Sequence, residues 1–124
     1  MIVVLFFSKL TPEAGEEYVA TDQRLMEKAR SAPGFVDVKS FTAADGERLT
    51  IVWWKDLETL RAWREDPEHR TAQARGRALW YRYYDMEVAE VVRESHHARE
   101  GSKNETESSP PAGLPDGSAL RPLG

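Results

Sequence analysis

The chain has 124 residues, enough for one domain. It carries 17 Lys and Arg against 21 Asp and Glu, a formal net charge of −4, and its basic residues are spread out, so no nucleic-acid or anionic-membrane partner is expected. It has no cysteine, which excludes a disulfide framework, a thiolate nucleophile and a Cys-ligated metal site. No segment approaches the roughly 18 apolar residues of a membrane span and the apolar start is too short for a signal sequence, so a cytoplasmic protein is expected.

The first elements are a strand and a helix. Residues 2–8 are apolar at both alternating parities, which predicts a strand that is covered on both faces. Thr11 offers a capping hydroxyl directly before Pro12 and acidic residues, which predicts the start of a helix. Apolar residues then recur at helical spacing until Pro33 stops the helix.

A hairpin is predicted next. Residues 35–42 and 48–55 are rich in β-branched and aromatic side chains. Between them lies Asp45-Gly46, a strong signal for a tight turn. We therefore expect these two strands to be antiparallel neighbours.

The second helical region is predicted to be broken. Asp56 can cap a short helix, and Asp66 followed by Pro67 repeats the signal for a helix that runs to about Leu79. The aromatic and β-branched stretch between Tyr81 and Val92 predicts the fourth strand.

From Ser95 the composition changes to Ser, Pro, Gly and charged residues, so residues 95–124 are expected to be a disordered polar tail after a folded domain of residues 1–94. The pair His96-His97 has no third ligand nearby, so no metal site is expected there.

This order of elements predicts an α+β domain with a ferredoxin-like β-α-β-β-α-β antiparallel sheet. Crossovers within one sheet are right-handed in about 98% of cases, so both helical regions should lie on one face. The strand at residues 48–55 is nevertheless apolar on both parities, with Leu49, Ile51 and Trp53 on one side and Val52 and Trp54 on the other. An uncovered apolar face of this size predicts a homodimer.

One stretch resembles a known family. Trp53-Trp54 ends a strand, Trp63 ends a helix, and Pro-Glu-His69 follows a turn later. Together with the order of elements, this stretch is similar to the antibiotic biosynthesis monooxygenase (ABM) domain of the dimeric α+β barrel superfamily, and within it to the small heme-degrading-monooxygenase-like proteins. The resemblance covers residues 1–93. It implies a homodimer whose two sheets form a barrel, with a cavity between sheet and helices in each subunit.

The resemblance implies an oxidoreductase. Some members of the family are monooxygenases that act on aromatic quinols without a cofactor, so the expected reaction is oxygenation of a small aromatic or quinol substrate. No Gly-rich phosphate loop follows a strand, so neither a flavin nor a nicotinamide is expected. The alternative is a non-catalytic dimer that binds an apolar ligand or serves in a stress response.

Heme use can be tested on the residues themselves. In heme-degrading relatives the axial histidine lies ten residues after the helix Trp, where this chain has Gln73. Those relatives also carry an asparagine on the first strand, whereas the matching stretch here is Leu5-Phe-Phe-Ser8. Heme is therefore disfavoured, and no cofactor is expected.

The candidate site lies on one helical stripe. His69 is the candidate catalytic residue, because a neutral imidazole is a suitable general base near neutral pH. The alternative is that His69 lies at the surface near the start of its helix, and that Trp63 is a packing residue. The residues expected to line the cavity beside His69 and bind substrate are Trp63, Gln73, Gly76, Trp80 and Tyr83.

Overall fold

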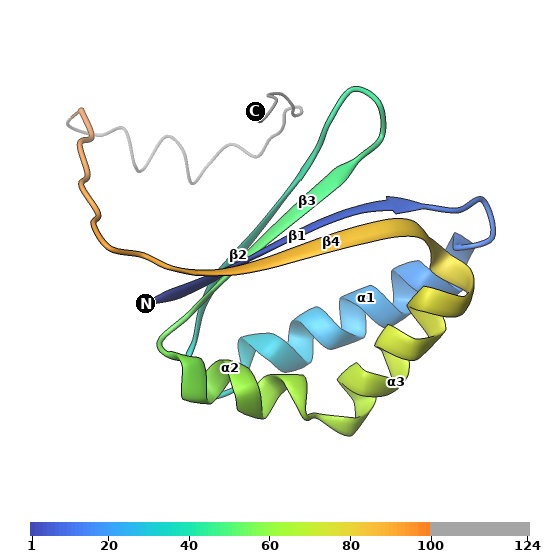
Figure 1. Cartoon of the computed structure of the whole chain (residues 1–124), viewed down its shortest axis with the longest axis horizontal. Coiled ribbons are helices and arrows are strands. Elements are labelled where there is room, and N and C mark those ends of the chain that lie inside the picture. The colour runs from blue at the N-terminus through green and yellow to red at the C-terminus, as the bar shows by residue number, and fades with distance from the viewer. Residues whose placement is uncertain (100–124) are drawn as a thin grey trace.

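The structure is a computed structural model that describes residues 1–99 (Figure 1). Its elements are β1 (Ile2–Leu10), α1 (Gly15–Arg30), β2 (Phe35–Thr42), β3 (Arg48–Trp54), α2 (Leu57–Arg64), α3 (Pro67–Arg75), the π-helical turn η1 (Gly76–Trp80) and β4 (Tyr81–Glu90). The predicted α+β order is confirmed, with the second helical region divided into α2, α3 and η1. No helix within the described residues is both long enough and apolar enough to cross a membrane.

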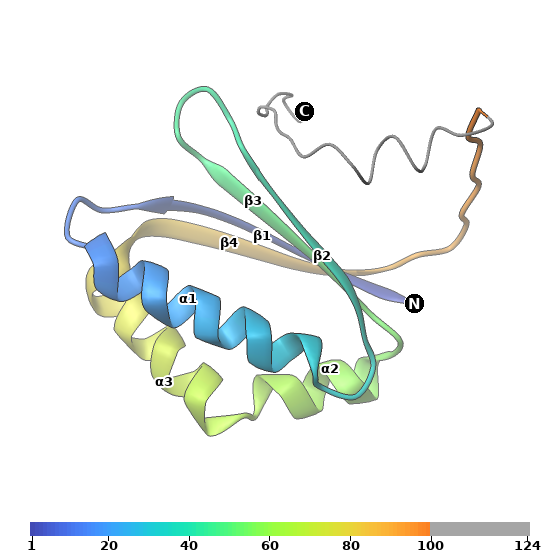
Figure 2. The same cartoon turned by 180° about the vertical axis from the view of Figure 1, so that it is seen from behind.

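The four strands form one antiparallel sheet in the order β2-β3-β1-β4. The central strands β1 and β3 pair from Ile2 opposite Trp54 to Ser8 opposite Arg48. All helices lie on one face of this sheet, as the two opposite views in Figures 1 and 2 show. This is the arrangement that two right-handed crossovers produce.

The second helical region is broken into α2 and α3 because each helix has its own N-terminal cap, as the sequence predicts. The Asp56 carboxylate accepts a hydrogen bond from the Thr59 backbone N–H at 2.9 Å and caps α2. The Asp66 carboxylate accepts one from the His69 backbone N–H at 3.0 Å, with Pro67 as the first residue of α3. Each helix thus starts with its own carboxylate cap. The cap accepts a hydrogen bond from a backbone N–H of the first turn, which has no acceptor within the helix.

The start of α1 differs from the prediction. The helix begins at Gly15 instead of near Pro12, and its first turn has no side-chain cap. The Thr11 hydroxyl donates a hydrogen bond to the Leu79 carbonyl at 2.6 Å, and the Thr11 backbone N–H donates one to the Trp80 carbonyl at 2.7 Å. Thr11 therefore joins the end of β1 to η1, an interaction that local sequence does not reveal.

The apolar core is divided into two clusters. One contains Ile2, Val4, Trp54 and Leu60, and the other contains Ala14, Tyr18 and Trp80. The clusters lie towards different ends of the space between the sheet and the helices. The division matters because a cavity occupies the region between them.

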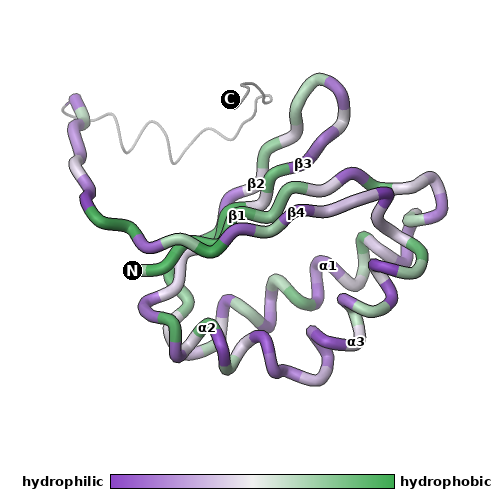
Figure 3. The backbone as a smooth tube through the Cα atoms, viewed as in Figure 1, coloured by the Kyte–Doolittle hydropathy of each residue, from purple (hydrophilic) through white to green (hydrophobic). Residues whose placement is uncertain are grey.

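The sheet face opposite the helices carries an apolar stripe, here called the outer stripe. It consists of half-buried side chains on the central strands, with Val3, Leu5 and Phe7 of β1 paired to Trp53, Ile51 and Leu49 of β3. Lys39 of β2 and Glu87 of β4 flank it in the same register. Figure 3 shows that apolar residues are concentrated in the strands, whereas α3 is mostly hydrophilic. No element among residues 1–99 covers the outer stripe (Figure 2).

The predicted polar tail begins at the edge of the described region. Residues 95–99 form neither helix nor strand. The rest of the expected tail, residues 100–124, lies outside the described residues.

Gly34 generates a stability prediction. It adopts a φ of +86° before β2, and a Cβ there would overlap the side chain of Thr59. Gly46 adopts a similar φ of +94°, but a Cβ there would meet only Lys9 Cε at 3.7 Å. We expect Gly34→Ala to lower the melting temperature more than Gly46→Ala, because Thr59 is held by its hydrogen bonds to Asp56.

Overpacking of this kind costs about 1–3 kcal/mol, and each kcal/mol shifts the melting temperature of a domain this size by about 4–8 °C. Thermal unfolding followed by circular dichroism measures both variants. Equal losses would show that backbone conformation alone, and not contact with Thr59, requires the glycine.

Candidate functional site

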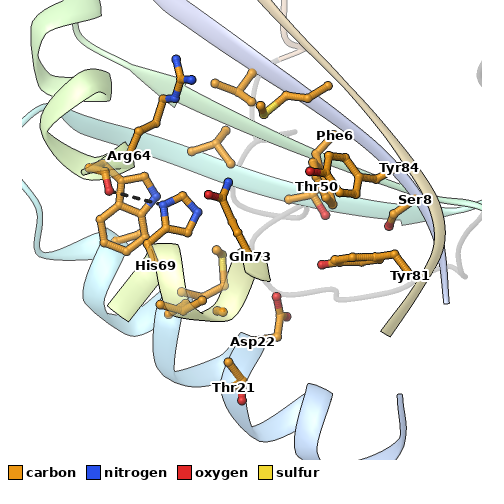
Figure 4. Close-up of a pocket in the computed structure, with 18 of the residues that line it drawn as sticks. Phe6, Ser8, Thr21, Asp22, Thr50, Arg64, His69, Gln73, Tyr81 and Tyr84 are labelled. Atoms are coloured by element: carbon orange, nitrogen blue, oxygen red, sulfur yellow. Dashed lines mark hydrogen bonds between the residues drawn. The ribbon is translucent and has the colours of Figure 1, made fainter. Parts of the chain in front are cut away.

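A pocket lies between the inner face of the sheet and the helices (Figure 4). Its volume is about 160 Å³. The sheet contributes mainly apolar and aromatic side chains, among them Val4, Phe6, Val52, Trp54, Tyr84 and Met86. The helices contribute the polar ones, chiefly Asp22 from α1, Arg64 from α2, and His69 and Gln73 from α3.

The pocket opens along the edge strand β4. Met86 and Val88 line it, yet their exposed fractions are 41% and 42%. An engineered apolar cavity of about 150 Å³ holds benzene, whereas sites for drug-sized ligands measure about 300–1,000 Å³. The pocket therefore has the size for one substituted aromatic ring, with substituents able to extend towards β4.

His69 is held by a stack of aromatic rings. Its imidazole stacks on Trp63 with ring centres 4.8 Å apart and planes 20° apart. Trp63 in turn stacks on the buried Trp54 at 6.2 Å and 28°. The chain of contacts fixes the imidazole against the sheet, and each such ring pair contributes about 0.5–1.5 kcal/mol beyond the area it buries.

The imidazole also has a defined hydrogen-bonding state. Its Nδ1 lies 3.3 Å from the carbonyl oxygen of Trp63, an acceptor, so in the neutral ring Nδ1 carries the proton and Nε2 keeps its lone pair. Burial lowers the pKa of His69, although the Trp63 carbonyl and the Asp66 carboxylate act in the opposite direction. Figure 4 shows the ring beside the Gln73 carboxamide in the cavity. His69 is thus arranged as an uncharged hydrogen-bond acceptor.

The start of α3, which carries His69, is tied to α1 by ion pairs. Lys28 Nζ lies 2.9 Å from an oxygen of Asp66 and 3.0 Å from one of Glu68, and Arg24 also pairs with Glu68. The hydrogen bond from Lys28 lowers the pKa of Asp66, with the His69 backbone N–H adding to the effect. Exposed ion pairs contribute little stability, so these contacts connect the start of α3 to α1 but do not determine where the helix begins.

A second polar group of residues lies at the α1 side of the pocket. Arg48 donates a hydrogen bond to the Tyr18 hydroxyl at 2.5 Å. Burial raises the pKa of the Tyr18 and Tyr81 phenols, so both remain protonated at neutral pH. Burial also raises the pKa of Asp22, with the Arg48 guanidinium opposing that effect.

The structure places four of the six sequence-predicted site residues in the pocket lining: Trp63, His69, Gln73 and Trp80. Two lie elsewhere. Tyr83 is on the outer face of β4, where its hydroxyl donates a hydrogen bond to Glu47 at 2.8 Å, because strand alternation directs Tyr84 and not Tyr83 inward. This corrects the expected cavity position of Tyr83.

Gly76 is the second correction. It is buried at the start of η1, and a Cβ there would lie 2.6 Å from Cε2 of Tyr81. The glycine therefore provides room for the Tyr81 ring, not for a ligand. The π-helical turn changes the helical register after Arg75. The predicted stripe assumed regular α-helical spacing and therefore did not account for this change.

Asp22 and Arg64 are charged pocket residues that the sequence reasoning missed. The sequence contains a signal for Asp22, which lies four residues after Tyr18 and three before Leu25, both buried on the inner face of α1. A carboxylate inside an apolar helical stripe is unusual unless something is bound or paired there.

The pocket fits neither a heme nor a metal ion. Gln73, which faces the pocket, occupies the position of the axial histidine in the heme-degrading proteins that this chain resembles. A pocket of about 160 Å³ is on the scale of one ring, not of a porphyrin. Among residues 1–99 no group of three His, Cys, Asp or Glu side chains could hold a metal ion.

Comparisons with known proteins support the fold described above. A sequence model described as antibiotic biosynthesis monooxygenase matches residues 1–75. The uncharacterized protein YqjZ of Bacillus subtilis is 34% identical over 90 residues, which cover 73% of this chain and 79% of YqjZ.

Two solved structures share the fold at lower identity. Rv0793 from Mycobacterium tuberculosis superposes with a TM-score of 0.67 at 19% identity, covering 77% of this chain and 98% of Rv0793. SnoaB from Streptomyces nogalater, a cofactor-independent oxygenase, gives a TM-score of 0.64 at 16% identity, covering 75% of this chain and 94% of SnoaB. At such identities these likenesses concern the fold alone.

We predict that His69 titrates below the ordinary histidine value of about 6.5, because its environment disfavours the charged ring. The unfolded chain then binds more protons than the folded one in the intervening pH range. The contribution of His69 to stability is therefore complete above about pH 6.5 and is lost as the pH falls through the folded-state pKa. NMR titration of the imidazole signals measures the midpoint.

Trp63→Ala serves as the comparison, because it uncovers one face of the imidazole and leaves the backbone carbonyl in place. In this variant the titration midpoint of His69 should move back towards the ordinary histidine pKa of about 6.5. A wild-type midpoint at or above about 6.5 would contradict the burial argument.

Proposed function

Since the chain belongs to the antibiotic biosynthesis monooxygenase family, we propose that it is a cofactor-independent monooxygenase of a small phenolic aromatic compound. The observation that carries the proposal is His69, an uncharged imidazole whose Nδ1 is fixed by a carbonyl while the ring lines an aromatic pocket of one-ring size. The description of SnoaB as a cofactor-independent oxygenase supports the same class of chemistry on the same fold.

The proposed reaction begins with a proton transfer. Nε2 of His69 accepts the proton of a substrate hydroxyl, and the resulting phenolate is rich enough in electrons to react with O₂. The Gln73 carboxamide beside the imidazole offers an N–H donor to the phenolate oxygen (Figure 4). The apolar walls provided by Val4, Val52 and Trp54 exclude water and hold the ring.

The overall reaction balances without a cofactor. One oxygen atom of O₂ forms a bond to a ring carbon that loses its hydrogen, and this position becomes a quinone carbonyl. The phenolic oxygen becomes the second carbonyl when it loses its proton. The other oxygen atom of O₂ leaves as water with these two hydrogens, so the aromatic compound supplies all the electrons.

We expect His69→Ala to reduce oxygenation of a phenolic substrate by about 10²–10⁴-fold, the usual contribution of a general base. Resorcinol and orcinol are suitable probes, because they are one-ring dihydroxyaromatics whose oxygenation gives coloured hydroxyquinones. Oxygen uptake and product mass measure the rate. The acidic limb of the pH profile should lie below about pH 6.5, since burial lowers the pKa of His69.

The matched control is Glu27→Gln, an exposed α1 residue outside the pocket, which should keep the wild-type rate. Equal rates for His69→Ala and the wild type would remove His69 as the base. If the wild type binds both probes without consuming oxygen, the family alternative of a non-catalytic protein that binds aromatic ligands replaces the oxygenase.

We also propose that the protein is a homodimer in which the outer stripes of two copies pack together. The support is the uncovered row of apolar residues on β1 and β3, bordered by charges such as Lys39 and Glu87. Soluble monomers rarely leave a continuous apolar patch of this kind in water. A twofold axis would place the stripe against itself, as a self-complementary interface requires.

Ile51→Glu should dissociate this dimer, because symmetry places an unpaired carboxylate from each copy in an apolar interface at a cost of several kcal/mol. Val19→Glu is the matched control, since Val19 is 51% exposed on α1 and away from the sheet. Size-exclusion chromatography with light scattering gives the mass. A monomeric wild type at micromolar concentration would overturn the proposal.

A further inference from the structure

Asp22 is a carboxylate without a partner in the wall of the pocket. It projects from α1 into the cavity and is half-buried (Figure 4). Among residues 1–99 no side chain or backbone group donates a hydrogen bond to it and no cation forms an ion pair with it, although the charge of Arg48 acts on it from a distance. The oxygens of Asp22 are not among the fully buried atoms, so they are accessible from the pocket to water or to a donor group of a ligand.

The groups around Asp22 are otherwise engaged. On its own helix, Tyr18 accepts the hydrogen bond of Arg48, and this guanidinium also lies 5.6 Å from the centre of the Tyr18 ring. Tyr81 from β4 packs edge-to-face on the Tyr18 ring, and no hydrogen bond joins its hydroxyl to Asp22 among residues 1–99. From α3, His69 is bonded to the Trp63 carbonyl. The carboxylate therefore remains free to accept a hydrogen bond from a bound molecule.

We propose that Asp22 anchors a hydroxyl group of the aromatic ligand, so that the substrate is a one-ring compound with two hydroxyl groups, one at Asp22 and one at His69. Both side chains face the cavity, and Gln73 lies between them in Figure 4. The inference rests on the proposed function and specifies its substrate class.

The charges around the pocket favour a hydroxyl over the other groups that a carboxylate could bind. Arg48 near Asp22 and Arg64 in the lining both repel an ammonium group. A ligand carboxylate would be repelled by Asp22 itself. A neutral hydroxyl meets neither repulsion and donates the hydrogen bond that the carboxylate lacks.

The test compares three ligands of similar size: resorcinol with two hydroxyls, meta-xylene with methyl groups in their place, and benzylamine with an ammonium group. Affinities are measured by calorimetry or NMR for the wild type, Asp22→Asn, Asp22→Leu and the control Glu27→Gln. Asp22→Asn should weaken resorcinol binding about tenfold and Asp22→Leu more, because hydrogen bonds to charged groups are the stronger ones. Binding of meta-xylene should be unchanged in Asp22→Asn and tighter in Asp22→Leu.

Stability provides a readout that does not depend on any ligand. Burial raises the pKa of Asp22, so the folded protein binds a proton more readily there than the unfolded chain does. The charged carboxylate therefore lowers stability at neutral pH, and this loss disappears below about pH 3.8, where both states are protonated. Asp22→Asn should raise the melting temperature at pH 7 and not at pH 3, whereas Glu27→Gln should not show this pattern.

The outcomes separate the two proposals. Unchanged resorcinol affinity in Asp22→Asn overturns the anchor, and turnover of resorcinol by the wild type would still uphold the oxygenase. Tighter binding of benzylamine than of resorcinol overturns the assignment of a hydroxyl. If the wild type binds none of the three ligands, the pocket does not hold an aromatic ring, and both proposals fail.

Discussion

The handedness of the two crossovers is the constraint on which the other features depend. Because both crossovers are right-handed, every helix lies on one face of the sheet and none covers the other. On the helical face, the broken second helix leaves a pocket between two small core clusters. On the opposite face, the apolar residues of β1 and β3 remain uncovered. One topological rule thus produces both a candidate ligand site and a candidate interface.

Within the pocket, aromatic packing and helix capping together determine where the imidazole lies. Trp54 on the sheet supports Trp63, and Trp63 supports His69, so the ring is positioned from β3 through α2. The Asp66 cap fixes the first turn of α3, and Lys28 joins that cap to α1. The ion pairs are largely exposed and contribute little stability, so the aromatic stack and the cap remain the main determinants of the imidazole position.

Burial acts on the two titratable groups of the pocket in the same sense. It disfavours the charged form of each, which raises the pKa of Asp22 and lowers that of His69. Replacing Asp22 with an apolar residue would increase stability. Functional sites often retain residues that lower stability because function requires them. This cost is consistent with the proposal that the Asp22 carboxylate and the His69 imidazole bind the same ligand.

The sequence by itself determined the features that depend on neighbouring residues. The caps at Asp56 and Asp66 fixed where α2 and α3 begin, and alternation along β1 and β3 indicated a sheet with two apolar faces. Only the tertiary structure decided the features that depend on distant contacts. Thr11 bonds to η1 and leaves α1 uncapped, and Gly76 makes room for Tyr81. Asp22 acquires its raised pKa from burial in a pocket whose other walls come from distant parts of the chain, because desolvation depends on all the atoms packed around a group and not on its sequence neighbours.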